Sequence, residues 1–194
     1  FGLYRRSQKR DLDGDIMAKI IKMTFVITVL AAICFFLLYY FINIGLFLTA
    51  AITFGTAAYH FCIRLVIGML FNIKMQNKAD YTKKWYRGSS LEQKLYQKMN
   101  IKKWKNKMPT YNIDIFDASK HSWDEIAQAM CQSELVHETN IIFSFLPMIA
   151  SIWFGAFAVF FVTSILSAVF DLMFVFMQRY NRSRILKMKE RAKF

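Results

Sequence analysis

The amino-acid sequence predicts an all-α integral membrane protein with four transmembrane helices. Residues 23–63 contain no Asp, Glu, Lys or Arg across 41 positions, and residues 141–177 contain only one charged residue, Asp171, in 37. A helix that crosses the hydrocarbon core needs about 20 apolar residues, so each stretch is long enough for two helices joined by a tight turn. The chain is also basic, with a formal net charge of +13, and nearly all of its charges lie outside these stretches.

The four expected helices form two hairpins. Asn43 and Gly45 interrupt the first apolar stretch, and both residue types favour turns. The second turn is expected between Ser151 and Gly155. On this basis the transmembrane helices span 23–42, 46–70, 139–156 and 159–178.

The rest of the chain falls into segments that these hairpins define. Because the chain begins with Phe1 and not with methionine, Met17 would serve as a native start, and we place no function in residues 1–16. The expected organisation is a basic N-terminal segment (1–22), the first hairpin (23–71), an interfacial segment (72–121), a helix that continues into the second hairpin (122–178) and a basic tail (179–194).

The distribution of charge predicts how the helices are oriented. Residues 1–22, 72–140 and 178–194 carry net charges of +3, +4 and +6, whereas both expected turns carry none. Lys and Arg accumulate on the cytoplasmic side of membrane proteins. Both termini and the central segment are therefore expected in the cytoplasm, in a multi-pass protein of the bacterial cell membrane. The basic segments are expected to bind anionic membrane lipid. They are not expected to bind nucleic acid, because no nucleic-acid recognition motif accompanies them.

The segment between the hairpins combines lysines with aromatic residues, among them Trp85, Tyr86, Tyr96 and Trp104. Amphipathic sequence of this kind lies in the headgroup plane, with aromatic rings in the apolar layer and lysines against anionic lipid. We favour such a cytoplasmic surface anchor at 77–112 over a dedicated substrate groove. Pro109 is expected to end it.

A helix is predicted to start at Ser122 and to run without a break into the third span. The residues Ser-Trp-Asp-Glu at 122–125 fit a capping box. Pro147 leaves the carbonyl of Phe143 without its helical partner, so this span should bend near the proline.

A polar cluster lies where this helix enters the membrane, formed by Glu134, His137, Glu138 and Asn140. Glu134 and His137 are one helical turn apart on the same face. A structural interpretation is an interfacial ion pair. A metal site of the di-iron kind needs the Glu-x-x-His motif twice, and the motif occurs here once. In a catalytic interpretation, His137 is a general base held by Glu134.

The fourth span ends with a second polar cluster, Gln-Arg-Tyr-Asn-Arg-Ser-Arg at 178–184. If both hairpins are antiparallel, this cluster returns to the same membrane face as His137. Paired arginine donors can grip a phosphate or a carboxylate in a way that lysine cannot. A purely topogenic role as a positive flank is the alternative.

Three segments resemble one known family. The motifs "SELVHETNIIFSFLPMI", "VFMQRYNRSRIL" and "IKKWKNKMPTYN" are similar to those of the glycosyl-4,4′-diaponeurosporenoate acyltransferase family of small bacterial membrane proteins, and the resemblance covers about residues 85–187. The resemblance implies transfer of a fatty acyl group to a sugar hydroxyl of a glycosylated carotenoid acid.

The residues and the resemblance together predict a membrane acyltransferase at the cytoplasmic leaflet. His137 would deprotonate the acceptor hydroxyl while Glu134 holds the imidazole. The expected donor is an acyl thioester of CoA or acyl carrier protein, and neither a cofactor nor a metal is expected. The residues expected to bind the donor are Gln178, Arg179, Tyr180, Asn181 and Arg182. Among them, Asn181 would donate a hydrogen bond to the oxyanion. The residues expected to bind the acceptor or to serve a structural role are His60, Arg64, Trp104, Glu138, Asn140 and Asp171.

A non-catalytic membrane subunit or scaffold is the alternative, and a transporter is a weaker one because four spans suit alternating access poorly. A cavity that opens to lipid and ends at His137 would favour the enzyme. A filled interface would favour the scaffold.

Two isolated charges lie inside the spans at matching depth. Arg64 is in the second span and Asp171 is in the fourth. An unpaired charge at that depth is costly, so we predict that the two bond directly or through one bridging polar group. His60, one turn from Arg64, would extend this network.

Overall fold

The computed structural model describes residues 2–104, 108 and 114–191. These residues contain no β-strand, which confirms the all-α prediction. The α-helices are α1 (Gly2–Ile42), α2 (Gly45–Met75), α3 (Ser90–Lys98), α4 (Ile101–Trp104), α5 (Trp123–Phe143), α6 (Ser151–Phe154) and α7 (Phe157–Arg191). The 3₁₀ helices are η1 (Lys84–Tyr86), η3 (Asp114–Phe116) and η4 (Leu146–Ala150).

Four helical stretches are long and apolar enough to cross a membrane, judged by length and composition. They are Lys19–Ile42, Gly45–Met75, Trp123–Phe154 and Phe157–Arg191. Large apolar side chains on them point outward, for example Leu30, Phe41 and Ile152. Continuous apolar surface of this extent suits contact with lipid tails.

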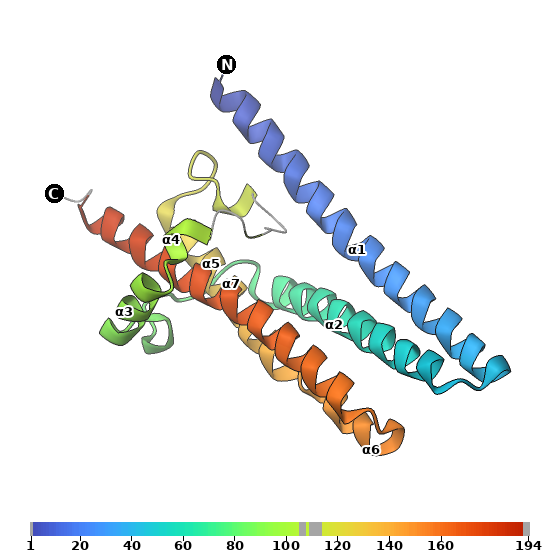
Figure 1. Cartoon of the computed structure of the whole chain (residues 1–194). Coiled ribbons are helices and arrows are strands. Elements are labelled where there is room, and N and C mark those ends of the chain that lie inside the picture. Colours follow the sequence, from blue (N-terminus) through green and yellow to red (C-terminus); the bar gives the residue numbers. More distant parts are fainter. Residues whose placement is uncertain (1, 105–107, 109–113, 192–194) are drawn as a thin grey trace.

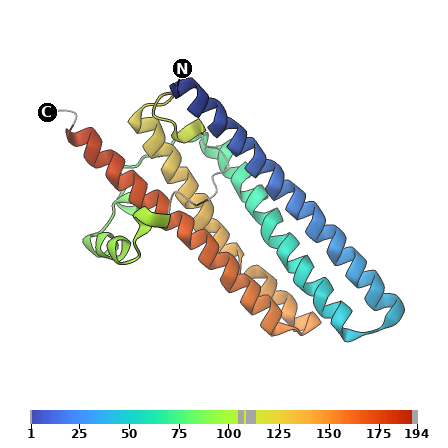
Figure 2. The same cartoon turned by 45° about the horizontal axis from the view of Figure 1, so that its top comes forward.

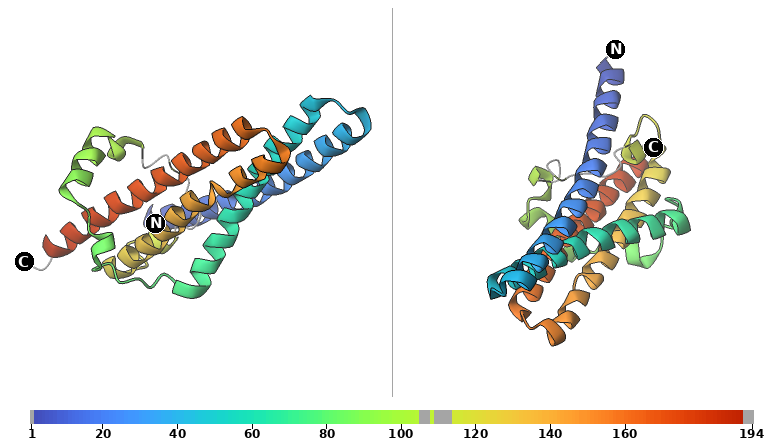
Figure 3. Two further views of the ribbon diagram at one scale, coloured as in Figure 1. Left: turned by 90° about the horizontal axis from the view of Figure 1, so that it is seen from below. Right: turned by 90° about the vertical axis from the view of Figure 1, so that its right-hand side faces the viewer.

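The long helices lie in two pairs. α1 and α2 run side by side in opposite directions, as do α5 and α7 (Figures 1 and 2). The connections within the two pairs lie at one end of the molecule, which we call the turn end. The start of α1, the end of α7 and the helices α3 and α4 lie toward the opposite end, the terminal end, and Figure 3 shows this arrangement from two further sides.

Both connections at the turn end use left-handed backbone conformations. Asn43, between α1 and α2, has a φ of 55°, and Gly155, between α6 and α7, has a φ of 64°. Glycine adopts this region without steric cost, and asparagine adopts it more readily than most residues. The helix breaks therefore lie at the positions that the sequence predicts.

α5 begins where the sequence predicts and ends early. The amide N of Ser122 donates to Glu125 Oε2 (2.7 Å), and the Ser122 hydroxyl accepts from the Glu125 amide (3.3 Å), which completes the capping box. α5 ends at Phe143, and Pro147 lies in η4, so the α-helix is interrupted next to the proline at which a bend is predicted. The Tyr59 hydroxyl of α2 donates to the carbonyl O of Phe143 (3.0 Å) and replaces the helical partner that the proline lacks.

The segment that follows α2 packs on the terminal end of the α5–α7 pair. Tyr86 and Tyr96 are 8% and 4% exposed, so their rings lie inside the protein and not in lipid, which corrects the expectation for these two residues. Trp85 remains largely exposed. Pro109 lies outside the described residues.

Most buried side chains lie between α5 and α7. Ile126 and Met130 of α5 pack with Ile185 of α7 and with Phe116 near the terminal end. Because two helices that pack along their length must bury the residues between them, polar residues on these faces are forced to find partners across the interface.

Candidate active site

Two polar clusters lie along the α5–α7 interface. The helical period directs Glu134 and His137 of α5 toward α7, and it directs Asp171, Arg179 and Arg182 of α7 toward α5. The cluster around Glu134 lies nearer the terminal end, and the cluster around His137 lies nearer the turn end.

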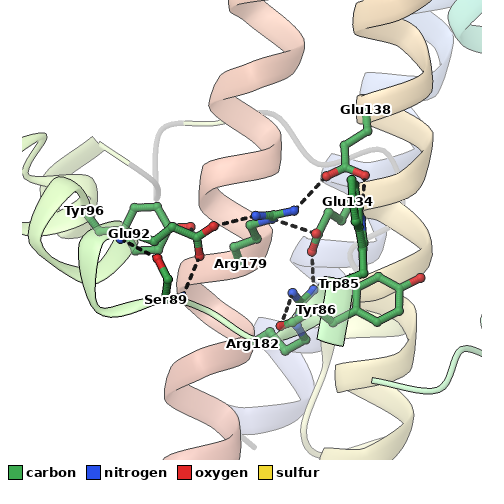
Figure 4. Close-up of polar contacts among 9 residues, drawn as sticks. All are labelled: Trp85, Tyr86, Ser89, Glu92, Tyr96, Glu134, Glu138, Arg179 and Arg182. Atoms are coloured by element: carbon green, nitrogen blue, oxygen red, sulfur yellow. Dashed lines mark hydrogen bonds and ion pairs between the residues drawn. The ribbon is translucent and has the colours of Figure 1, made fainter. Parts of the chain in front are cut away.

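Glu134 is fully buried between two arginines (Figure 4). Its Oε1 accepts a hydrogen bond from Arg179 Nε (2.7 Å), and its Oε2 accepts one from Arg182 Nη1. Arg182, which is only 2% exposed, also donates from Nη2 to the carbonyl O of Tyr86 (2.9 Å). These contacts satisfy a carboxylate that would otherwise be costly to bury.

Arg179 contacts three carboxylates. Besides the bond to Glu134, Nη1 donates to Glu92 Oε1 (2.7 Å) and Nη2 donates to Glu138 Oε1 (2.9 Å). The second oxygen of Glu138 accepts from the indole N–H of Trp85 (3.0 Å). These bonds use three of the five N–H groups of Arg179, and the three carboxylates surround its single positive charge. The role of the arginines in donor binding stays a prediction.

These contacts tie the short helices that follow α2 to the α5–α7 pair (Figure 4). Glu92 forms a capping box with Ser89 at the start of α3, so its carboxylate joins the helix to Arg179. Burial raises the pKa of Tyr86 to about 12, and burial together with the charge of Glu92 raises the pKa of Tyr96. Both phenols therefore stay neutral near pH 7. We call the cluster of Glu92, Glu134, Glu138, Arg179 and Arg182 the clasp, because its contacts join α3 and the segment around Tyr86 to α5 and α7.

The other residues predicted to bind the donor lie on the same part of α7. Gln178 donates from Nε2 to the hydroxyl of Ser133 (3.0 Å). The ring of Tyr180 meets that of Tyr96 edge to face, with centroids 6.2 Å apart. Asn181 is partly exposed. Their part in donor binding also stays a prediction.

The carboxylate partner of His137 is Asp171 and not Glu134. His137 Nδ1 lies 2.8 Å from Asp171 Oδ1, and the imidazole stacks on the Phe174 ring, with centroids 4.5 Å apart and planes at 10°. Both oxygens of Glu134 are bound by arginines instead. The prediction that Glu134 holds His137 is therefore wrong. A carboxylate does hold the histidine, as expected, but it belongs to Asp171.

Asp171 is also the partner of Arg64, which confirms the prediction that these charges bond, and the bond is direct. Arg64 Nη2 and Nε lie 2.7 Å and 3.1 Å from Asp171 Oδ2, and the carboxylate is fully buried. Arg64 Nη2 also donates to the hydroxyl of Ser167 (2.8 Å). Asn140 Nδ2 approaches Asp171 Oδ1 at 3.4 Å. The second and fourth spans and the start of the third thus meet at one carboxylate.

Several buried polar atoms beside this network have no hydrogen-bond partner among the residues that the structure describes. His60 joins the network through its backbone, since its carbonyl O accepts from Arg64 Nη1 (3.3 Å), while both ring nitrogens are unpartnered. Asn140 Oδ1 and Ser164 Oγ are unpartnered too. Trp104, by contrast, donates its indole N–H to the carbonyl O of Met99 (3.1 Å) within its own segment.

An apolar groove of about 560 Å³ lies between the two helix pairs. It is lined by α1, α2, η4, α6 and the start of α7, and Tyr59 is its lining residue nearest the terminal end on α2. Neither His137 nor Glu134 lines it. A cavity that ends at His137 was expected for an enzyme, and this groove stops short of that residue.

Some residues of both clusters were not expected from the sequence. Trp85, Glu92, Ser167 and Phe174 contact predicted site residues through side chains. The only local signal for Glu92 is the pattern Ser-Ser-Leu-Glu at 89–92, which indicates a helix start and no partner. The contacts of Trp85, Glu92, Ser167 and Phe174 join segments that are distant in the sequence, and no local pattern indicates them.

The His137–Asp171 pair has the geometry of a general base. A carboxylate on one imidazole nitrogen fixes the tautomer and balances the positive charge that forms when the other nitrogen takes a proton. His137 keeps 18% of its side chain exposed, whereas Asp171 is fully enclosed. The His137 side chain is therefore partly accessible, whereas its carboxylate partner is not.

Comparison with known proteins identifies the family. A family model described as glycosyl-4,4′-diaponeurosporenoate acyltransferase matches residues 82–191, more than half of the chain. No curated protein and no solved structure matches the chain. The matched region contains Glu134, His137, Asp171 and both arginines of the clasp. The chain therefore belongs to the glycosyl-4,4′-diaponeurosporenoate acyltransferase family, as its sequence motifs predicted.

Proposed function

We propose that this chain is a membrane acyltransferase that moves a fatty acyl group from a thioester donor to a hydroxyl of a glycosylated carotenoid acid or a related glycolipid. Membership of the family supports the reaction class. The observation that carries the assignment of a site is the 2.8 Å contact between His137 Nδ1 and Asp171 Oδ1.

His137 is the general base of this reaction. Because Nδ1 is bound to Asp171, Nε2 is the nitrogen that takes the proton of the acceptor hydroxyl as its oxygen attacks the thioester carbonyl carbon. The tetrahedral intermediate then collapses, the C–S bond breaks, and the imidazolium returns the proton to the leaving thiolate. The products are an ester and a free thiol. Asp171 holds the imidazole tautomer and stabilises the imidazolium.

Arg64 and Glu134 act outside the chemistry. Arg64 fixes the Asp171 carboxylate through two hydrogen bonds, so it positions the residue that positions the base. Glu134 accepts hydrogen bonds from Arg179 and Arg182, and Arg182 in turn holds the segment around Tyr86 against the α5–α7 pair.

The reaction takes place at the cytoplasmic leaflet in this proposal. The positive charge of residues 1–22, 72–140 and 178–194 supports a cytoplasmic terminal end. Thioesters of CoA and acyl carrier protein are cytoplasmic donors, so they would approach from that side.

The test is a comparison of lipid extracts by mass spectrometry. Cells that make a glycosylated carotenoid acid are given the intact chain, His137→Ala or Asp171→Asn. The intact chain should add the mass of one fatty acyl group to the glycolipid. His137→Ala should lower the rate at least about 100-fold, since general base catalysis contributes about 10²–10⁴-fold.

The matched control is His121→Ala, because His121 lies at the protein surface and pairs only loosely with Glu125 at 3.9 Å. It should acylate as the intact chain does. Folded yield is measured for every variant, because Asp171→Asn also leaves Arg64 without its anion. Wild-type acylation by His137→Ala would refute the mechanism, and no acylation by the intact chain would favour a non-catalytic membrane subunit or scaffold.

A further inference from the structure

The apolar groove between the helix pairs has the form of a site for one hydrocarbon chain. On α2 its lining residues run from Leu48 to Tyr59, which corresponds to roughly 16 Å along the helix at 1.5 Å per residue. The volume of about 560 Å³ is within the range of about 300–1,000 Å³ for small-molecule sites. Apart from Thr56 and Tyr59, its lining consists of apolar residues and glycine.

Polar residues lie just beyond the end of the groove that faces the active site. Thr56 of α2 and Phe160 of α7 line the groove, and one turn further along these helices lie His60 and Ser164. His60 is 5% exposed and Ser164 is 0% exposed. Within the described part of the chain, neither of the two His60 ring nitrogens nor the Ser164 hydroxyl has a hydrogen-bond partner. Unpartnered polar groups at such depth are costly, so they indicate a ligand with a polar end.

The groove also points toward the proposed base. Arg64 follows His60 by one turn on α2 and binds Asp171, which holds His137. Ser164 lies roughly 10 Å before Asp171 along α7. The order along the bundle is thus an apolar groove, a layer with unused hydrogen-bonding capacity, and the His137–Asp171 pair.

We propose that this groove holds the acyl chain of the thioester donor, with the chain passing His60 and Ser164 so that its thioester carbonyl reaches the His137–Asp171 pair, and that the depth of the groove selects the length of the transferred chain. This inference rests on the proposed function. A saturated chain is flexible enough to follow the groove, whereas the rigid polyene of a carotenoid is longer than it, and a phospholipid brings two tails.

The chain offers a matched pair of glycines for the test. Gly55 lines the groove, and a Cβ added there meets no other atom within 4 Å; Gly68, on the same helix, has the same free space but does not line the groove. Gly55→Leu and Gly68→Leu gain the same helix propensity. Gly55→Leu should shorten the acyl chains found in the product, with the longest chains disfavoured roughly 10-fold or more, because a pocket discriminates single methylenes by about 10–200-fold. Gly68→Leu should leave the chain-length profile unchanged.

Photolabelling tests the groove without catalysis. The purified full chain is irradiated with palmitoyl-CoA that carries a diazirine at the end of the acyl chain, and labelled peptides are mapped by mass spectrometry. Labels are expected on the residues that line the groove, within 32–36, 48–59 or 146–160, and Gly55→Leu should weaken them whereas Gly68→Leu should not. Labels outside these ranges, or equal labelling of both variants, would overturn the inference.

Competition identifies the occupant. Unlabelled palmitoyl-CoA should displace the label, whereas displacement by the glycosylated carotenoid acid alone, or by phosphatidylglycerol alone, would assign the groove to the acceptor or to a bilayer lipid and overturn the proposal. If the intact chain binds the probe in the groove but transfers no acyl group, the proposed function fails and the chain-binding site stands. If it transfers acyl groups and labels appear elsewhere, only the groove assignment fails.

Discussion

Replacement of Arg182 by methionine should lower the free energy of unfolding by about 3 kcal/mol. Arg182 is 2% exposed, and it bonds the fully buried Glu134 and the carbonyl O of Tyr86. Removal of one partner from a buried ion pair costs about 3–5 kcal/mol, because a buried charge is left uncompensated. Since Glu134 keeps its bond to Arg179, we expect the lower end of that range.

The double variant Glu134→Leu, Arg182→Met should recover most of this loss. It removes both buried charges, and Arg179 keeps Glu92 and Glu138 as partners. Replacement of a buried pair by apolar residues is often neutral or stabilising. The coupling between the two substitutions, measured as a double-mutant cycle, therefore reports the pair directly.

Cys131 supplies the assay. It is fully buried, whereas Cys34 is exposed and Cys62 is partly exposed, so the chain is first changed to serine at these two positions. Unfolding is titrated with SDS in mixed micelles and followed by the reaction of Cys131 with a thiol-specific dye.

The control for this measurement is Asp114→Asn, which breaks an ion pair with Lys120 whose side chains are 48% and 36% exposed. An exposed pair contributes about 0–1 kcal/mol. If Arg182→Met costs no more than this control, or if the double variant is as unstable as the sum of the single variants, the clasp does not stabilise the fold as we describe.

Three further predictions concern other contacts. Arg64→Leu and Asp171→Leu should each lower the folded yield in size-exclusion chromatography. The double variant should restore the yield but not the acylation, and restored acylation would mean that the pair has a structural role only. Tyr59→Phe should lower the free energy of unfolding by about 1 kcal/mol. The loss should be smaller in a Pro147→Ala chain, because the backbone N–H of residue 147 can then bind the carbonyl O of Phe143, and equal losses in both chains would contradict this. Burial raises the pKa of Tyr86 from 10.0 to about 12. The stability gained from its neutral phenol is therefore complete below pH 10 and is lost as the pH rises from 10 toward 12. Over that interval the unfolding temperature should fall less for Tyr86→Phe than for the intact chain.

The sequence alone was sufficient for features that depend on local order or on the membrane as a solvent. Apolar length predicts the four candidate spans, and the capping box at Ser122 and the break near Pro147 follow from hydrogen bonds within one helix. Arg64 and Asp171 were predicted to meet because two opposite charges at one depth of an apolar layer have few other partners. The family was also recognisable, because its motifs are contiguous.

Only the tertiary structure decided which carboxylate holds the histidine. Glu134 and His137 are three residues apart, so their side chains differ by about 60° around α5 and by about 4.5 Å along it. That offset is enough to direct them to different parts of α7: Arg179 and Asp171 are eight residues apart and therefore separated by about 12 Å along the helix axis. How α5 is rotated against α7 results from the packing of both helices along their whole length. Residue spacing on one helix carries no information about that rotation, so the same Glu-x-x-His pattern fits a paired and an unpaired arrangement equally well.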